Sequence, residues 1–303
     1  MISGSNRMKG HALALFTVFV WGSTLIASKM LLTVFTPLQI MVMRFAMAYL
    51  VLWLIKPKWL PIRWRDELGF LLMGLLGGTC YFLCENTALT FTLAANVGII
   101  LSAVPIFTAI LAHFFTRDEK FRKNMLFGSL LAFVGVALAV FNGTVVLKLN
   151  PLGDCLALLG AFCWASYSMI LKRYAERFHA IVLARKIMFY GFITSLPVLL
   201  AEGQPFVIAN LAEPYLLLCI LFLGLIGSGL CSAAWGSASK RIGIVTTSNY
   251  IFLNPFITMV MARLFLNEPI SWMGIAGAVL IIVGILLCGK KEKDAPVIGA
   301  EAS

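Results

Sequence analysis

The chain has 303 residues, of which 61% are hydrophobic and only 12% are charged, and its mean hydropathy is +0.95. A soluble domain carries about 25% charged residues, so this composition excludes a soluble globular domain, and its apolar content excludes a disordered chain. In a chain of this composition, the net charge of +11 indicates basic cytoplasmic loops rather than a nucleic-acid partner.

Ten apolar runs follow one another along the chain, separated by short polar loops. A membrane-crossing helix needs about 20 apolar residues. The runs lie at residues 11–32, 38–55, 68–90, 93–115, 124–141, 152–171, 181–201, 215–238, 244–266 and 271–288. We therefore predict an all-α polytopic membrane protein with ten transmembrane helices. The first run imitates a signal peptide, but it is too long and no small-residue cleavage site follows it closely, so it is kept as a helix.

The basic residues predict the orientation of these helices. If the N-terminus is cytoplasmic, 20 of the 24 Lys and Arg fall in cytoplasmic segments. Of the other four, only Lys148 lies in an external loop; Lys29, Arg44 and Arg263 lie within predicted helices. This one-sided distribution predicts a multi-pass protein of a bacterial inner (plasma) membrane with both termini in the cytoplasm.

The two halves of the chain resemble each other. The segment MGLLGG at 73–78 is similar to LGLIGS at 223–228, an offset of 150 residues. Trp21 precedes Lys29 by eight residues, and Trp164 precedes Lys172 by eight. Further pairs at offsets of 150 or 149 are Ala88 with Ala238, Pro105 with Pro255, Glu119 with Glu268, Gly128 with Gly277 and Gly135 with Gly284. We interpret 1–145 and 146–290 as homologous halves, followed by a cytoplasmic tail at 291–303.

Each predicted half has five helices, and this odd number fixes the arrangement. The second half must enter the membrane from the opposite side, so the halves are inverted repeats. Many secondary transporters use such repeats for alternating access; duplication retained for packing alone is the other interpretation. We expect the repeated glycines to allow close helix packing. Pro105 and Pro255 are expected within helices, where they kink the helix or free carbonyls that line a cavity.

The chain resembles the EamA-type branch of the drug/metabolite transporter superfamily. The features that carry the resemblance are ten helices in a 5+5 repeat, Trp21, Arg44 early in the second helix, Pro105 and Glu119 before the fifth helix. The resemblance implies export of small metabolites, often amino acids or related compounds, driven by a proton or substrate gradient. The short multidrug-resistance branch, with four helices and a membrane Glu in its first helix, does not fit.

Charged residues in a bilayer are costly and mark candidate functional positions. Glu85 lies near the outer end of the third predicted helix, with Tyr81 one turn away and Asn86 adjacent. Three roles are open for Glu85. It forms a fixed ion pair with Arg44 or Lys29, or it carries a proton or contacts substrate. In the third alternative it faces lipid and extends its carboxylate towards the membrane surface.

The inverted repeat suggests two gates. Lys29, Arg44 and Glu268 are placed near the outer rim, and their counterparts Lys172, Arg185 and Glu119 near the inner rim. Ion pairs in each set would close one side in turn. The alternative is that the basic residues only fix topology and that the two glutamates cap helices.

Aromatic side chains are expected to line a central cavity. Together with the charged group, the predicted substrate and ion pathway comprises Trp21, Arg44, Tyr81, Glu85, Asn86, Trp164, Tyr167, Trp235, Asn249, Phe252 and Phe256. Aromatic walls suit amphipathic or cationic solutes, although aromatics also fill ordinary cores.

Signatures of other functions are missing from the sequence. It has no P-loop, no nucleophile–base constellation, no Cys–His metal spacing among seven cysteines, and no cofactor motif. We therefore predict a secondary carrier, not an enzyme, that exports a small metabolite. The predicted partners are the lipid bilayer and a small-molecule substrate, and protons if the carrier is proton-coupled. An uptake carrier, a facilitative channel and a polytopic membrane enzyme are the alternatives.

Overall fold

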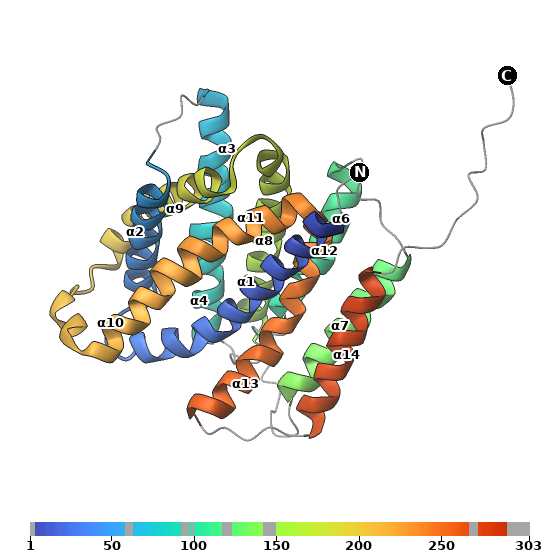
Figure 1. Ribbon diagram of the computed structural model, residues 1–303. Helices are drawn as coiled ribbons and strands as arrows, with labels where there is room; N and C mark the ends of the chain where they lie inside the picture. Colours follow the sequence, from blue (N-terminus) through green and yellow to red (C-terminus); the bar gives the residue numbers. More distant parts are fainter. Residues whose placement is uncertain are drawn as a thin grey trace, which may run out of the picture.

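The computed structural model describes residues 4–57, 63–91, 97, 100–116, 123–141, 150–266 and 272–289. The described segments are helices joined by short connections (Figure 1). In chain order they are α1 (Gly4–Leu31), α2 (Pro37–Ile55), α3 (Trp64–Gly74), η1 (Leu75–Cys80), α4 (Tyr81–Phe91), α6 (Val104–Phe115), α7 (Lys123–Phe141), α8 (Pro151–Arg177), α9 (Ala180–Glu202), η2 (Ile208–Ala212), α10 (Pro214–Leu221), η3 (Phe222–Leu230), α11 (Cys231–Ile242), α12 (Ile244–Asn249), η4 (Tyr250–Leu253), α13 (Asn254–Leu266) and α14 (Trp272–Gly289).

The all-helical architecture expected from the sequence is confirmed, and each of the ten apolar runs contains helix. Six helical segments are long and apolar enough to cross a membrane, and three shorter apolar helices accompany them, among the described residues. Large apolar side chains cover the exterior, with Trp272 85% and Leu200 79% exposed. Such an exterior requires an apolar solvent, which a bilayer provides.

Helices α2 and α9 pack antiparallel, and polar contacts join both of their ends. At the start of α2 the N-cap Thr36 donates a hydrogen bond to Glu202 at the end of α9 (2.9 Å). At the opposite end Arg185 donates to the carbonyl of Lys56, which caps α2 (2.8 Å). Between these ends the rings of Tyr49 and Phe189 lie 5.4 Å apart.

The two glycine-rich segments that resemble each other in sequence are both π-helical. The π-helix η1 contains LLGG from the first motif, and η3 contains the whole of the second. Their glycines make corresponding contacts: a Cβ at Gly77 would lie 2.5 Å from the Tyr167 ring in α8, and one at Gly227 would lie 2.9 Å from Thr24 in α1. Only a residue without a Cβ permits these approaches.

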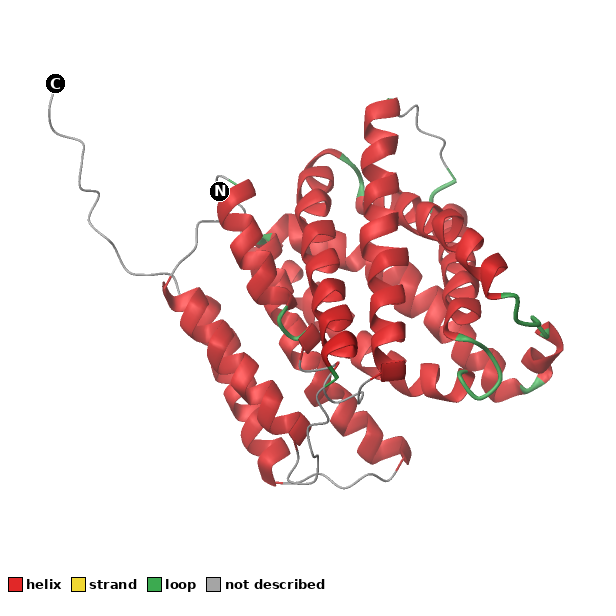
Figure 2. Ribbon diagram, turned by 180° about the vertical axis from the view of Figure 1, so that it is seen from behind, coloured by secondary structure: helices red, strands yellow, loops and turns green. Residues whose placement is uncertain are grey.

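Helices α7 and α14 lie side by side at one edge of the molecule in both views (Figures 1 and 2). A Cβ at Gly128 would lie 2.5 Å from the carbonyl oxygen of Gly284, and a Cβ at Gly135 would lie 2.6 Å from that of Gly277. Because the later residue of one helix faces the earlier residue of the other, the two helices run antiparallel. Backbones in direct contact gain dispersion energy that larger residues would prevent.

The expectation that Pro105 and Pro255 lie inside helices was wrong in detail. Pro105 is in the first turn of α6, directly after a turn at Ser102–Ala103, and Pro255 is the second residue of α13, directly after the 3-10 segment η4. In the first turn of a helix, proline removes an N–H that has no helical partner anyway. Both prolines therefore begin a new helix after an interruption rather than kink a continuous one.

Gly128→Ala should destabilise the protein by about 1–3 kcal/mol, because its methyl group must displace the backbone of α14. Gly236→Ala is the matched control: it is also a helical glycine, and its nearest neighbours to a Cβ are 3.9 Å away. Equilibrium unfolding in mixed micelles measures both variants. Equal stability of the two variants would contradict the close packing of α7 on α14.

Candidate substrate site

Aromatic rings from four helices meet at the centre of the bundle. The ring of Trp21 in α1 lies 5.5 Å from that of Trp164 in α8 and 5.0 Å from that of Trp235 in α11. Trp164 also contacts Tyr81 of α4 at 4.9 Å and Tyr167 of its own helix at 5.3 Å. These five side chains, the aromatic cluster, were all predicted as pathway residues, and tilted or edge-to-face contacts of this kind are favourable.

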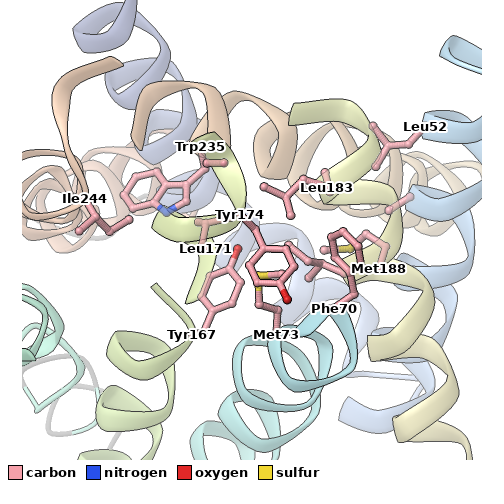
Figure 3. Close-up of a cluster of buried hydrophobic side chains, with 14 of the residues drawn as sticks. Leu52, Phe70, Met73, Tyr167, Leu171, Tyr174, Leu183, Met188, Trp235 and Ile244 are labelled. Atoms are coloured by element: carbon pink, nitrogen blue, oxygen red, sulfur yellow. The ribbon is translucent and has the colours of Figure 1, made fainter. Parts of the chain in front are cut away.

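The three indoles of the aromatic cluster differ in their hydrogen bonding. Trp21 Nε1 donates to the carbonyl of Gly227 in η3 at 2.9 Å. The Nε1 atoms of Trp164 and Trp235 are buried and have no hydrogen-bond partner in the described part of the chain. Figure 3 shows Trp235 close to Leu171 and Tyr167, within the tightly packed core. A buried donor without an acceptor costs free energy, so each such group calls for a physical reason.

A charged group adjoins the aromatic cluster through Tyr81. The Tyr81 hydroxyl hydrogen bonds to the Glu85 carboxylate, which also interacts electrostatically with Arg44. Arg44 Nε donates to Ser228 Oγ at 2.9 Å, and its guanidinium lies 5.1 Å from the Phe82 ring centroid. Arg44, Tyr81 and Glu85 are each partly accessible, and together they place both signs of charge beside an aromatic surface.

The ninth predicted helix, at residues 244–266, is divided into α12, η4 and α13, and this division separates three of the predicted pathway residues. Asn249 in α12 is buried, and its Oδ1 has no hydrogen-bond partner among the described residues. Phe252 is fully buried against Ala132 and Ile281, away from the aromatic cluster, and Phe256 packs between the two regions. The 3-10 segment η4 causes this change, because three residues per turn rotate later side chains relative to the 3.6 of an α-helix.

The described residues include only part of the two predicted gates. Lys172 in α8 and Arg185 in α9 are both buried, with 9% and 5% exposure. Glu119 and Glu268 lie outside the described residues, and the side chains of Lys29 and Asn86 are likewise not described.

An ion-pair group that sequence reasoning missed joins the start of α3 to α8 and α9. Arg177 donates two hydrogen bonds to the Asp66 carboxylate, at 2.8 and 2.9 Å, which is the bidentate geometry that makes such pairs specific. Glu67 accepts from Lys186 at 2.5 Å and from the Tyr190 hydroxyl at 2.7 Å. The sequence signal for this group was the pair of adjacent acids, Asp66 and Glu67, in the first turn of a helix near basic loops.

Ser228 and Phe82, which hold Arg44, were also missed. The signal for Ser228 was a difference between the halves, since the position 150 residues earlier is Gly78. Phe82 follows Tyr81 directly and looked like one of many membrane aromatics. The described residues include no group of His, Cys, Asp and Glu that could hold a metal ion, and what the site offers is aromatic surface, hydrogen-bond donors and paired charges.

An apolar exterior around a polar, aromatic centre defines a multi-pass helical membrane protein with an interior suited to contacting a solute. The chain belongs to the EamA-like transporter family, whose sequence model matches residues 8–141 and again residues 151–289. It is therefore a membrane transporter of the drug/metabolite transporter superfamily and not an enzyme, with a small-molecule substrate and the lipid bilayer as partners. The double match indicates duplicated halves.

Relatives from bacteria cover most of the chain. It is 26% identical over 280 residues to the uncharacterized transporter YyaM of Bacillus subtilis, covering 89% of this chain and 90% of the relative. It is 26% identical to a probable amino-acid metabolite efflux pump of Salmonella typhimurium, covering 92% and 94%. The aromatic amino acid exporter YddG of Salmonella typhimurium is 28% identical over 224 residues, covering 69% and 71%.

The fold itself is shared with a solved protein. A crystal structure superposes on this chain with a TM-score of 0.79 at 17% sequence identity, covering 92% of this chain and 96% of the other. At this identity the likeness concerns the fold alone. The bacterial relatives point to the plasma membrane as the location of this multi-pass protein.

Ser228→Ala should lower stability by about 1–3 kcal/mol, because it leaves the Arg44 Nε donor without its acceptor. Ser23→Ala is the control, since the Ser23 hydroxyl is exposed and, within the described part of the chain, donates only to the carbonyl of Phe19 one turn earlier. Unfolding in mixed micelles compares the two variants with the parent. A Ser228→Ala variant as stable as Ser23→Ala would show that the Arg44–Ser228 bond contributes nothing.

Proposed function

We propose that this transporter is a secondary carrier that exports a small metabolite, an amino acid or a related compound, by alternating access. The observation that carries the proposal is the central site, where an aromatic cluster adjoins the oppositely charged Arg44 and Glu85. An aromatic wall next to both signs of charge suits a zwitterion with an apolar part. The printed functions of two relatives, an efflux pump and an exporter, favour the same substrate class and direction.

The proposal includes ten membrane crossings arranged as inverted five-helix repeats, with halves at 1–145 and 146–290 and a tail at 291–303. Its support is the contact between α7 and α14. In the sequence repeat Gly128 corresponds to Gly277 and Gly135 to Gly284, yet in space Gly128 faces Gly284 and Gly135 faces Gly277. A two-fold axis in the membrane plane makes equivalent helices of the two repeats meet antiparallel, with equivalent glycines in contact.

Reporter fusions test the ten-crossing topology with both termini in the cytoplasm. A fusion at Lys120 should be active only with a cytoplasmic reporter, and a fusion at Asn210 only with a periplasmic one, because the intervening crossings are odd in number. Reporters of both kinds at each position serve as mutual controls. Finding the two positions on the same side would contradict the topology without touching membership in the family.

The substrate and ion pathway in this proposal comprises the aromatic cluster with Arg44, Glu85, Asn86, Asn249 and Phe256, whereas Phe252 packs against Ala132 and Ile281 outside it. In this proposal Glu85 carries the coupled proton, and its protonation would release the Arg44 charge and the Tyr81 hydroxyl that the ionised carboxylate holds. Lys29 and Glu268 close the outer side, and Lys172, Arg185 and Glu119 close the inner side. Lys172 and Arg185 are buried in the conformation described here, and opening the inner side would expose them to water, where ion pairs are weak enough to break reversibly.

Glu85→Gln should abolish the stimulation of transport by a pH gradient, because an amide carries no titratable proton. Uptake into inverted vesicles, with amino acids, amines and sugars as a panel, measures this with and without the gradient. Glu213→Gln is the control, since Glu213 is exposed and its side chain makes no capping bond at the start of α10. A pH response that survives in Glu85→Gln would rule out Glu85 as the proton carrier.

A facilitative channel and an uptake carrier are the alternative functions. Counterflow in proteoliposomes separates a carrier from a channel, because only a carrier is accelerated by substrate on the far side. The imposed gradient then decides between export and uptake for the same protein.

A further inference from the structure

Trp21 and Trp164 occupy equivalent positions in the two halves. They lie 143 residues apart, and the same offset relates Lys29 to Lys172 and Thr24 to Tyr167. Thr24 packs over Gly227 and Tyr167 packs over Gly77, so the residue three positions after each tryptophan contacts the equivalent glycine of the other half. The two helix pairs α1–η3 and α8–η1 are thus built on one plan.

Each π-helix also ends in the same way. At the end of η3 the N–H of Cys231 donates to the carbonyl of Ile226, and at the end of η1 the N–H of Tyr81 donates to those of Leu76 and Gly78. Where a π-helix returns to α-helical spacing, one carbonyl loses its helical donor. In η3 the carbonyl that follows Ile226 belongs to Gly227, and it accepts the Trp21 indole.

The two halves differ at one bond. Trp21 Nε1 donates to Gly227, and the equivalent bond in the other half would join Trp164 Nε1 to Gly77. Trp164 Nε1 instead is buried with no partner among the described residues. The glycine contacts that flank this position are present in both halves, so the difference lies in the orientation of the Trp164 indole rather than in helix packing.

We propose that the Trp21–Gly227 and Trp164–Gly77 indole–carbonyl bonds are two alternating latches, and that transport exchanges one for the other. This inference rests on the alternating access proposed above. In inverted repeats, a contact made by one half in one state is made by the other half in the opposite state. The conformation described here holds the Trp21 latch closed and the Trp164 latch open.

Exchange of equivalent bonds keeps the two states close in energy. Opening one latch leaves an indole donor unpaired, and the unpaired Trp164 Nε1 is buried in the conformation described here, which costs free energy. Closing the other latch at the same time recovers an equal bond, so the number of unpaired indoles in the pair stays at one. Trp21 and Trp164 touch, at 5.5 Å between ring centroids, which couples the rotation of one ring to that of the other.

The test replaces each indole separately and measures the ratio of the two states. Trp21→Phe removes the bond of the conformation described here, and Trp164→Phe removes the bond of the opposite conformation. Each loss of a net hydrogen bond corresponds to about a five-fold change in the ratio, in opposite directions for the two variants. The full-length protein is used in proteoliposomes.

Spin-label distances report the ratio at the two ends of the molecule. One label pair is placed at Arg65 and Arg173, and the other at Met30 and Tyr215. All four positions are exposed, and each pair is the repeat equivalent of the other. Trp21→Phe should deplete the distances of the conformation described here in both pairs, and Trp164→Phe should enrich them.

Substitution by benzothienylalanine at each tryptophan provides the second set of variants, because a sulfur atom replaces only the N–H and the ring volume is kept. Shifts in the same direction for both positions, or no shift in either set, would overturn the latch proposal. Counterflow of the amino acids, amines and sugars of the vesicle panel is measured in parallel with the parent protein. If counterflow is present but the spin-label distances do not shift in opposite directions, only the latch proposal is rejected. If counterflow is absent, the proposed carrier function is rejected.

Discussion

A bilayer offers no hydrogen-bond partner to a peptide group, and the rest of this structure depends on that constraint. Every described crossing is helical because a helix satisfies its own backbone. A departure from α-helical spacing frees a backbone group, which another part of the protein can take up. The π-helix η3 is the clearest case, since the Gly227 carbonyl in it accepts the Trp21 indole from a different helix.

Glycine determines how closely these helices approach. In α7 and α14 the contact is backbone on backbone at Gly128 and Gly284, and in the centre Gly77 and Gly227 accept side chains that a methyl group would exclude. Because no hydrophobic force drives helices together inside lipid, such contacts supply the association energy through dispersion. The same contacts bring aromatic residues from α1, α4, α8 and α11 to one place.

The charged residues of the interior also need partners from other helices. Arg44 is held by a hydroxyl, an aromatic face and a carboxylate, so its charge is compensated without a single tight pair. Asp66 and Arg177, in contrast, form a bidentate pair at the end of the bundle. A compensated but partly accessible charge can exchange partners with a solute, which the closed geometry of the Asp66 pair does not favour.

The sequence by itself determined the helices and the family and named most residues of the candidate site, because hydropathy, repeated glycines and rare membrane charges are local signals. Trp21, Arg44, Tyr81, Glu85 and Trp164 were recognisable from type and position alone. Only the tertiary structure decided which helices pair and how the site is held. Ser228, Phe82 and the Asp66–Arg177 pair depend on contacts between residues far apart in the chain, and Phe252 turned away because η4 changes the helical period. Periodicity assumes one helix type throughout, so a change of hydrogen-bond spacing inside a helix is visible only once the backbone is folded.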